Sequence, residues 1–127
     1  AYMTAVQIKP EYAKAYLSMG LEYLSHEDHD RAKEALKNAL SYRPSLVAAW
    51  IALADIARID GDSDQCMESL DSALSLEPRN LEVHNRLTEH WIGKGDVSKA
   101  RIHFEIVEQQ DPSRADVIRS SVYPDQG

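Results

Sequence analysis

The chain has 127 residues, of which 43% are hydrophobic, and a formal net charge of -7. This length fits one domain with its own core, and the composition is too apolar for a disordered chain. The acidity argues against nucleic acid or an anionic membrane as a partner, and no apolar run approaches the ~20 residues of a membrane span.

Prolines recur at a fixed interval along the chain. Pro10, Pro44, Pro78 and Pro112 are separated by three equal intervals. The same step carries Gly61 onto Gly95, and it aligns further sets of small and of large apolar residues. A constant period of about 34 residues indicates an array of structural repeats.

Each repeat is predicted to consist of two helices. Apolar side chains recur at three- and four-residue spacing in 13–26 and 30–42, and again in 47–60 and 64–76. Short polar corners join the paired helices, and a proline closes the linker after each second helix because it lacks the N–H of a continuing helix. We therefore divide the chain into the remnant of a preceding second helix, three full repeats, and a short capping helix with a tail: 1–12, 13–46, 47–80, 81–114 and 115–127.

The corner in 59–71 has alternating aspartates, as a calcium loop does. However, Gln65 stands where that loop needs a glycine, and Asp71 is one methylene shorter than the closing glutamate. Gly61 matches Gly95 in the next repeat, so we predict a helix–helix corner in which glycine allows the bend and aspartate caps the next helix. No metal site or cofactor is expected.

The repeated positions carry a recognisable pattern. The first helix has a bulky aromatic residue, then a leucine-glycine-like pair, then an aromatic residue, and the second has small, large and small residues before the proline. The first repeat shows it at Tyr16, Met19, Gly20, Tyr23, Ala32, Leu36, Ala39 and Pro44. The pattern resembles the tetratricopeptide repeat family. The resemblance implies an all-α, right-handed superhelix, a solenoid of antiparallel helix pairs with a concave face for extended partners.

By analogy with the family, the first helix of each pair lines this concave groove. The residues expected to contact a partner there are Lys14, Leu17, Leu21, Ile51, Asp55, Arg58, Asn85, Arg86 and Glu89. The groove is apolar in its first half and polar in its second, which suits an amphipathic helix or a mixed peptide. The alternative is that the leucines at 17, 21 and 24 simply pack against a helix of the preceding repeat.

Two activities known in the family are not supported. Members that clamp acidic chaperone tails use Lys, Asn and Arg at positions held here by Leu17, Leu21, Ala52, Glu82 and Arg86, and only Arg86 matches. The asparagine ladder of O-linked N-acetylglucosamine transferase falls on Ser18, Ala52 and Arg86.

The remaining polar residues suggest no catalytic constellation. We interpret His26 and His29 as solvated turn residues, His84 as a half-buried packing residue, and Cys66 as an inert core thiol. The only cysteine also leaves no internal disulfide to expect, which favours the cytoplasm; the periplasm or a lumen is the alternative if a signal peptide was removed.

The predicted function is a non-catalytic scaffold that binds a protein or peptide partner. Two alternatives remain open. One is self-association through exposed repeat ends, at Tyr2, Val6 or Phe104. The other is that the chain is the repeat segment of a larger enzyme or of a transport or assembly factor.

Overall fold

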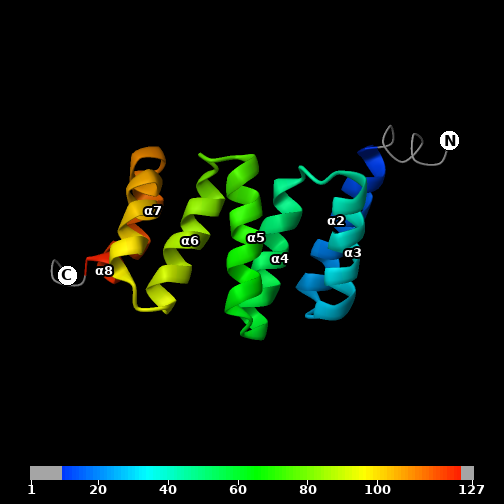
Figure 1. The fold of residues 1–127 in the computed structure, drawn as a ribbon, viewed down its shortest axis with the longest axis horizontal. Coiled ribbons are helices and arrows are strands. Elements are labelled where there is room, and N and C mark those ends of the chain that lie inside the picture. Colours follow the sequence, from blue (N-terminus) through cyan, green and yellow to red (C-terminus); the bar gives the residue numbers. More distant parts are fainter. Residues whose placement is uncertain (1–9, 124–127) are drawn as a thin grey trace. The chain divides into compact units, whose positions relative to one another are not determined.

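The computed structural model describes residues 10–123, and the side chains from Tyr12 onward; every regular element in this range is an α-helix. The helices are α2 (Pro10–Ser25), α3 (His29–Tyr42), α4 (Val47–Asp60), α5 (Ser63–Leu76), α6 (Leu81–Gly93), α7 (Val97–Gln110) and α8 (Pro112–Val122) (Figure 1). Two compact units are present, Ala1–Leu76 and Glu77–Gly127, and the second begins just before α6. Of the helices in residues 10–123, none combines the length and apolarity that a membrane crossing needs.

The first unit contains two helix pairs, α2 with α3 and α4 with α5 (Figure 1). In the first pair the helices approach closely at Gly20, where an added Cβ would lie 2.8 Å from the Cγ of Leu36. Leu36 is fully buried and belongs to a core cluster that α3 and α4 share. Small residues in this cluster, such as Ala32 and Ala49, leave room for the helices to pack against each other.

The corners between paired helices share one backbone conformation. Glu27, Gly61 and Gly95 follow one another at the same interval as the prolines, and their φ angles are 61°, 80° and 79°. These values lie in the left-handed region, which suits glycine and strains a residue with a Cβ. The predicted role of Gly61 at a helix–helix corner is confirmed, and the first repeat uses a glutamate in the same conformation.

An aspartate follows each of these corner residues and caps the next helix. The carboxylates of Asp28, Asp62 and Asp96 accept hydrogen bonds from backbone N–H groups three residues on, at 3.3, 3.1 and 3.1 Å. Each bond satisfies a donor that the first turn of a helix would leave without a partner. The capping predicted for the segment 59–71 is therefore confirmed.

The second unit pairs α6 with α7 and packs α8 on α7. Its core includes Phe104, Val107, Ala115 and Val122, and the ring of Tyr123 meets Phe104 edge-on with centroids 5.7 Å apart. Phe104 was expected as a candidate contact with a second copy of the chain. This expectation is wrong, because α8 contributes to a core in which Phe104 is fully buried.

Two helices begin earlier than the sequence predicted. Pro10 starts α2 and Pro112 starts α8, whereas we had placed these residues in linkers. Residues 10–12 therefore belong to α2 and not to the remnant of a preceding helix, and the capping helix begins three residues before 115. Proline suits the first position of a helix, where its missing N–H would have no partner. Residues 1–9, with Tyr2 and Val6, lie outside the described residues.

The all-α architecture of antiparallel helix pairs is confirmed. The constant repeat period, which the prolines indicated, is visible in the corners and in their caps.

Candidate partner-binding surface

In the first unit, the predicted groove residues lie on α2 and α4, which are in contact with each other. Lys14, Leu21 and Arg58 are exposed, whereas Ile51 and Asp55 are half-buried. Leu21 has 45% of its surface exposed, although it is apolar. This part of the predicted set therefore offers a mixed surface with one prominent apolar side chain.

Leu17 has a different environment from Leu21. It packs against the core cluster formed by α3 and α4, and so does Leu24. Part of the apolar stripe on α2 thus has a structural role within the first unit itself. No helix of a preceding repeat is needed to explain Leu17 and Leu24, and Leu21 is the leucine of this stripe with the most exposed surface.

In the second unit, the predicted residues Asn85, Arg86 and Glu89 lie on α6. Asn85 is only 6% exposed, and its amide donates to the Glu89 carboxylate at 3.3 Å. Arg86 donates to Oε2 of Glu82 at 3.0 Å and is half-buried. Asn85 therefore presents little surface to a partner, and Arg86 and Glu89 are the more accessible members of this group.

Glu82 is the centre of an ion-pair cluster that the sequence did not predict. Arg114, from α8, donates to both of its carboxylate oxygens, and the second of these contacts measures 2.8 Å. The hydrogen bond from Arg114 holds the pKa of Glu82 below its ordinary value, although partial burial opposes this effect. Because Arg86 binds the same carboxylate, two guanidinium groups are fixed around one glutamate.

Asp60, the first aspartate of the calcium-like segment, has partners on another helix. Its Oδ1 accepts a hydrogen bond from Nδ1 of His29 at 2.9 Å, and its Oδ2 lies 3.5 Å from Nζ of Lys33. The hydrogen bond from His29 lowers the pKa of Asp60. Asp60 thus joins α4 to α3, and Asp62 caps α5, so the two aspartates have separate structural roles.

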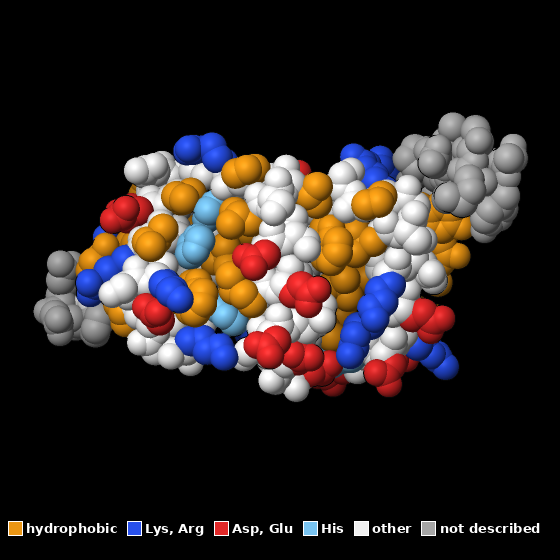
Figure 2. Space-filling model, viewed as in Figure 1, with side chains coloured by type: hydrophobic (Ala, Val, Ile, Leu, Met, Phe, Trp, Pro, Cys, Tyr) orange, Lys and Arg blue, Asp and Glu red, His pale blue; other side chains and the backbone are white. Residues whose placement is uncertain are grey.

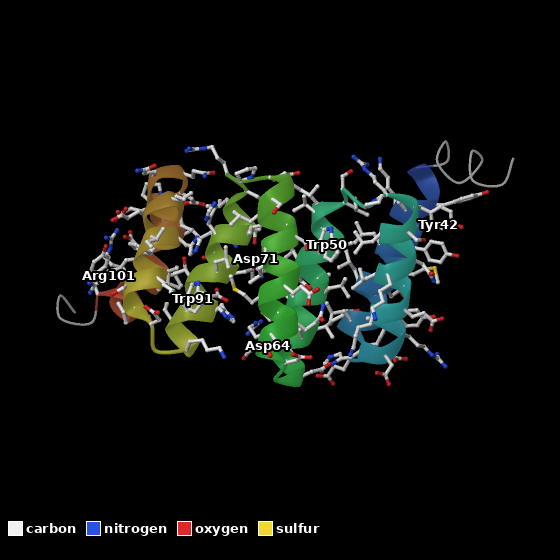
Figure 3. All side chains as sticks on the ribbon, viewed as in Figure 1. Tyr42, Trp50, Asp64, Asp71, Trp91 and Arg101 are labelled. Carbon is white, nitrogen blue, oxygen red and sulfur yellow. The ribbon has the colours of Figure 1, made fainter. Side chains whose placement is uncertain are left out.

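Acidic side chains lie on the face of α5 that Figure 2 shows. Asp64 and Asp71 lie along one face of α5, and both are exposed, as is Glu68 between them (Figure 3). α5 has no basic residue. Since α5 is the second helix of its pair, this acidic face is separate from the residues predicted to bind a partner.

Cys66 faces the core of the first unit. It is buried, and this burial raises the pKa of its thiol. Because the thiolate is the reactive form, the geometry agrees with the predicted inert thiol.

His84 differs from its predicted role as a half-buried packing residue. It is buried, with 3% of its surface exposed, and both ring nitrogens make hydrogen bonds. Nε2 lies 2.6 Å from the carbonyl oxygen of Pro78, and Nδ1 lies 3.0 Å from Nδ1 of His103. At the equivalent position of the preceding repeat, the ring of Trp50, on α4, donates to the carbonyl oxygen of Pro44 at 3.0 Å (Figure 3).

A shallow hollow on α2 and α3 lies outside the predicted set. It has a volume of about 250 Å³ and is lined by Tyr16, Met19 and Tyr23 of α2 together with Arg31 and Glu34 of α3. The sequence signal was present, since Tyr16 and Tyr23 are members of the repeat pattern, but the pattern alone did not indicate a hollow.

Comparison with known proteins identifies the repeat. A family model described as "Tetratricopeptide repeat" matches residues 17–65. The fold is similar to the first repeat domain of Spaghetti (RPAP3) in complex with an HSP90 peptide, with a TM-score of 0.82 and 13% identity over 92% of this chain and 98% of that chain. Residues 17–65 therefore match the tetratricopeptide repeat family. Such repeats form protein-interaction modules, and this chain is a module of that kind.

Two similar proteins carry pilus-related names. The type IV pilus assembly protein PilF of Pseudomonas aeruginosa is 32% identical over 77 residues, which are 61% of this chain and 31% of PilF. A solved structure of Pseudomonas aeruginosa PilF has a TM-score of 0.74 and 27% identity, covering 89% of this chain and 50% of that one. The structure of PilW, a type IV pilus biogenesis factor, has a TM-score of 0.73 and 24% identity over 79% of this chain and 46% of that chain. The chain thus spans about a third of the length of the curated relative it matches.

Proposed function

We propose that the chain is a non-catalytic scaffold that binds a peptide or a helix of a partner protein through its first helices, α2, α4 and α6. The observation that carries this proposal is the exposed surface of α2, on which Leu21 keeps 45% of its area accessible beside the exposed Lys14 and Ser18. An accessible leucine among polar residues is a suitable contact for an apolar side chain of a bound segment. The partner-binding residues in this proposal are Lys14, Leu21, Ile51, Asp55, Arg58, Arg86 and Glu89.

The chemistry of the charged residues supports a scaffold. Asp60, Asp62 and Glu82 hold the fold together through caps and ion pairs, and the thiol of Cys66 is buried. Asp60 and Asp62 belong to the segment that resembles a calcium loop, and each of them has a structural role.

The names of the relatives suggest the process in which the partner takes part. We propose that the partner is a component of type IV pilus assembly, because PilF of Pseudomonas aeruginosa is 32% identical over 77 residues. In this reading the chain corresponds to a repeat segment of an assembly factor.

The test compares two triple variants. Leu21→Ala, Ile51→Ala and Arg86→Ala together alter the three proposed binding helices, whereas Lys37→Ala, Glu68→Ala and Glu105→Ala alter exposed positions on the second helices, α3, α5 and α7. The immobilised chain is used to capture proteins from a bacterium that makes type IV pili, and bound proteins are identified by mass spectrometry. Circular dichroism checks that both variants keep their helices.

We expect the first variant to lose a pilus-assembly protein that the wild-type chain and the second variant both capture. Capture that survives in the first variant would contradict the proposed surface. Specific capture of a protein unrelated to pili would contradict only the proposed process.

A further inference from the structure

The second unit contains two imidazole rings that share a hydrogen bond. His84 of α6 and His103 of α7 have their Nδ1 atoms 3.0 Å apart, and Nε2 of His84 lies 2.6 Å from the carbonyl oxygen of Pro78. A carbonyl oxygen only accepts, so Nε2 of His84 carries a proton and donates it. Nδ1 of a neutral His84 is then the acceptor, and Nδ1 of His103 is the donor.

This arrangement fixes the segment that precedes α6. Pro78 lies in the linker Glu77–Asn80, and Asn80 caps α6 by accepting a hydrogen bond from the backbone N–H of Val83 at 3.1 Å. The side chain of Gln110, at the end of α7, donates to the carbonyl oxygen of Arg79 at 3.1 Å. The linker is thus held to α7 directly by Gln110 and indirectly by the chain from Pro78 through His84 to His103.

The contact through Gln110 and the contact through the two histidines respond differently to a fall in pH. The amide of Gln110 does not titrate, whereas the two imidazoles can each take up a proton. A first added proton goes to His103, which is more exposed than His84, and leaves a charged donor facing Nδ1 of His84. Such a charge-assisted hydrogen bond is stronger than a neutral one, so the connection persists.

A second added proton has no acceptable position. It must go to Nδ1 of His84, and two N–H groups would then face each other across 3.0 Å. The hydrogen bond would be lost, and two positive rings would lie with their centroids 5.2 Å apart, one of them buried. The pair therefore accepts one proton and opens when it takes up the second.

We propose that His84 and His103 form an acid-sensitive latch, which holds the linker Glu77–Asn80 and the first turn of α6 on α7 and releases them when both rings are protonated. This inference does not depend on the proposed partner. It concerns the helix that carries Arg86 and Glu89, so partner binding by α6 would weaken in acid if the scaffold function is also correct.

The charged groups around the pair are engaged with other residues or exposed. On the linker and α6, Glu77 accepts from Asn80, Glu89 accepts from Asn85, the ring of His90 meets Trp91, and Glu82 forms one cluster with Arg86 and Arg114. On α7, Lys99 lies near Asp96 and over the ring of Trp91, Arg101 donates to the carbonyl of Val122, and Glu108 pairs with Arg119. Arg79 and Glu105 are exposed.

The first unit provides a natural control for the latch. Trp50 occupies the position of His84 one repeat earlier and donates its ring N–H to Pro44 in the same way, but an indole does not titrate in this range. His84→Trp should therefore keep the bond to Pro78 and remove the sensitivity to acid. His103→Gln is the second variant, because an amide can donate to a neutral His84 or accept from a protonated one.

The test measures urea unfolding of the whole chain between pH 8 and pH 5 for the wild type, both variants and His26→Gln, which alters an exposed histidine outside the pair. While the latch is closed, from about pH 6 down to the pH at which it opens, the folded wild type should hold about one proton fewer than the unfolded chain. In that interval its unfolding equilibrium constant should rise about tenfold more, for each unit by which the pH falls, than that of His103→Gln, and the extra rise should cease once the latch is open. We expect His26→Gln to follow the wild type and His84→Trp to follow His103→Gln.

Nitrogen-15 spectra of the imidazoles supply a readout that does not depend on how well a variant folds. At pH 8 we expect the proton on Nε2 of His84 and on Nδ1 of His103. A proton on Nδ1 of His84 at this pH, or the same pH profile for the wild type and His103→Gln, would overturn the proposal.

Discussion

Trp50 and His84, which occupy equivalent positions in successive repeats, each donate a ring N–H to the carbonyl of a proline six residues upstream, at 3.0 Å to Pro44 and 2.6 Å to Pro78. The family pattern requires a bulky ring at this position, and these contacts add a second requirement. The ring must also satisfy a backbone carbonyl in the linker before its helix. This explains how a histidine can replace a tryptophan here without loss of the bond.

Trp50→Phe tests this requirement in the first unit. Phenylalanine keeps a large apolar ring but has no N–H, so the carbonyl of Pro44 loses its donor. We expect the free energy of unfolding to fall by about 1 kcal/mol, as for an ordinary hydrogen bond. Urea unfolding measures the change. No loss of stability would mean that only the ring's bulk matters at this position.

Glu27→Gly should stabilise the protein. Glu27 has a φ of 61°, whereas Gly61 and Gly95 occupy the same conformation in the later repeats. Removing the strained Cβ should raise the free energy of unfolding by about 1 kcal/mol. The matched control is Gly95→Ala, which introduces the same strain and should lower stability by about as much. A Glu27→Gly protein less stable than the wild type would show that the glutamate side chain has a favourable role.

Gly20→Ala should destabilise the first helix pair. The new Cβ would lie 2.8 Å from Cγ of the buried Leu36, so one of the helices or the leucine must move. Overpacking of this kind costs about 1–3 kcal/mol. Leu36→Ala removes the obstructing atoms, and the double variant should be more stable than the sum of the two single effects predicts. Strict additivity in this double-mutant cycle would argue against the clash.

Glu82→Gln should change how stability depends on pH. The pKa of Glu82 in the folded protein lies below its ordinary value of 4.5, so its pairing with Arg114 stabilises the fold above about pH 4.5 and is lost as the pH falls through the folded pKa. Both side chains are partly exposed to solvent, so we expect the variant to lose less than about 1 kcal/mol at pH 7. The two proteins should converge once the pH falls below the folded pKa of Glu82. A difference in stability that stays the same as the pH is lowered would exclude ionisation as its cause.

Cys66→Ala should be tolerated. Cys66 occupies the position of Ala32 and Ala100 in the neighbouring repeats, and all three side chains are buried. We expect a change in the free energy of unfolding within about 1 kcal/mol, because alanine already fits this position twice. In the wild type, a thiol reagent should react slowly in buffer and rapidly in urea. Rapid reaction of the folded protein would show that the thiol is accessible.

The repeated parts of the fold were predictable because their causes are local. Gly61 and Gly95 indicated the corners, and Asp62 and Asp96 indicated the caps, since each bends or caps the chain within a few residues of itself. Glu27 shows the limit of this reasoning. The left-handed conformation of Glu27 follows from the repeat period, but a glutamate does not by itself indicate a positive φ angle.

The contacts between distant helices were not predictable. Asp60 meets His29 across 31 residues, and Arg114 meets Glu82 across 32. Long polar side chains can reach many neighbours once helices pack, so sequence spacing alone does not select the pair. The candidate groove illustrates the same difficulty: helical spacing placed Leu17 and Asn85 on it, but packing turned Leu17 toward the core and left Asn85 buried.

The corner of each hairpin is closed by residues that are neighbours along the chain. Asp62, for example, accepts from Gln65 at 3.1 Å immediately after the left-handed Gly61, and no side chain from elsewhere takes part in this bond. Duplication or deletion of one whole module therefore leaves every remaining corner chemically complete. During evolution such an array can therefore gain or lose whole modules without any change in the residues that form its remaining corners.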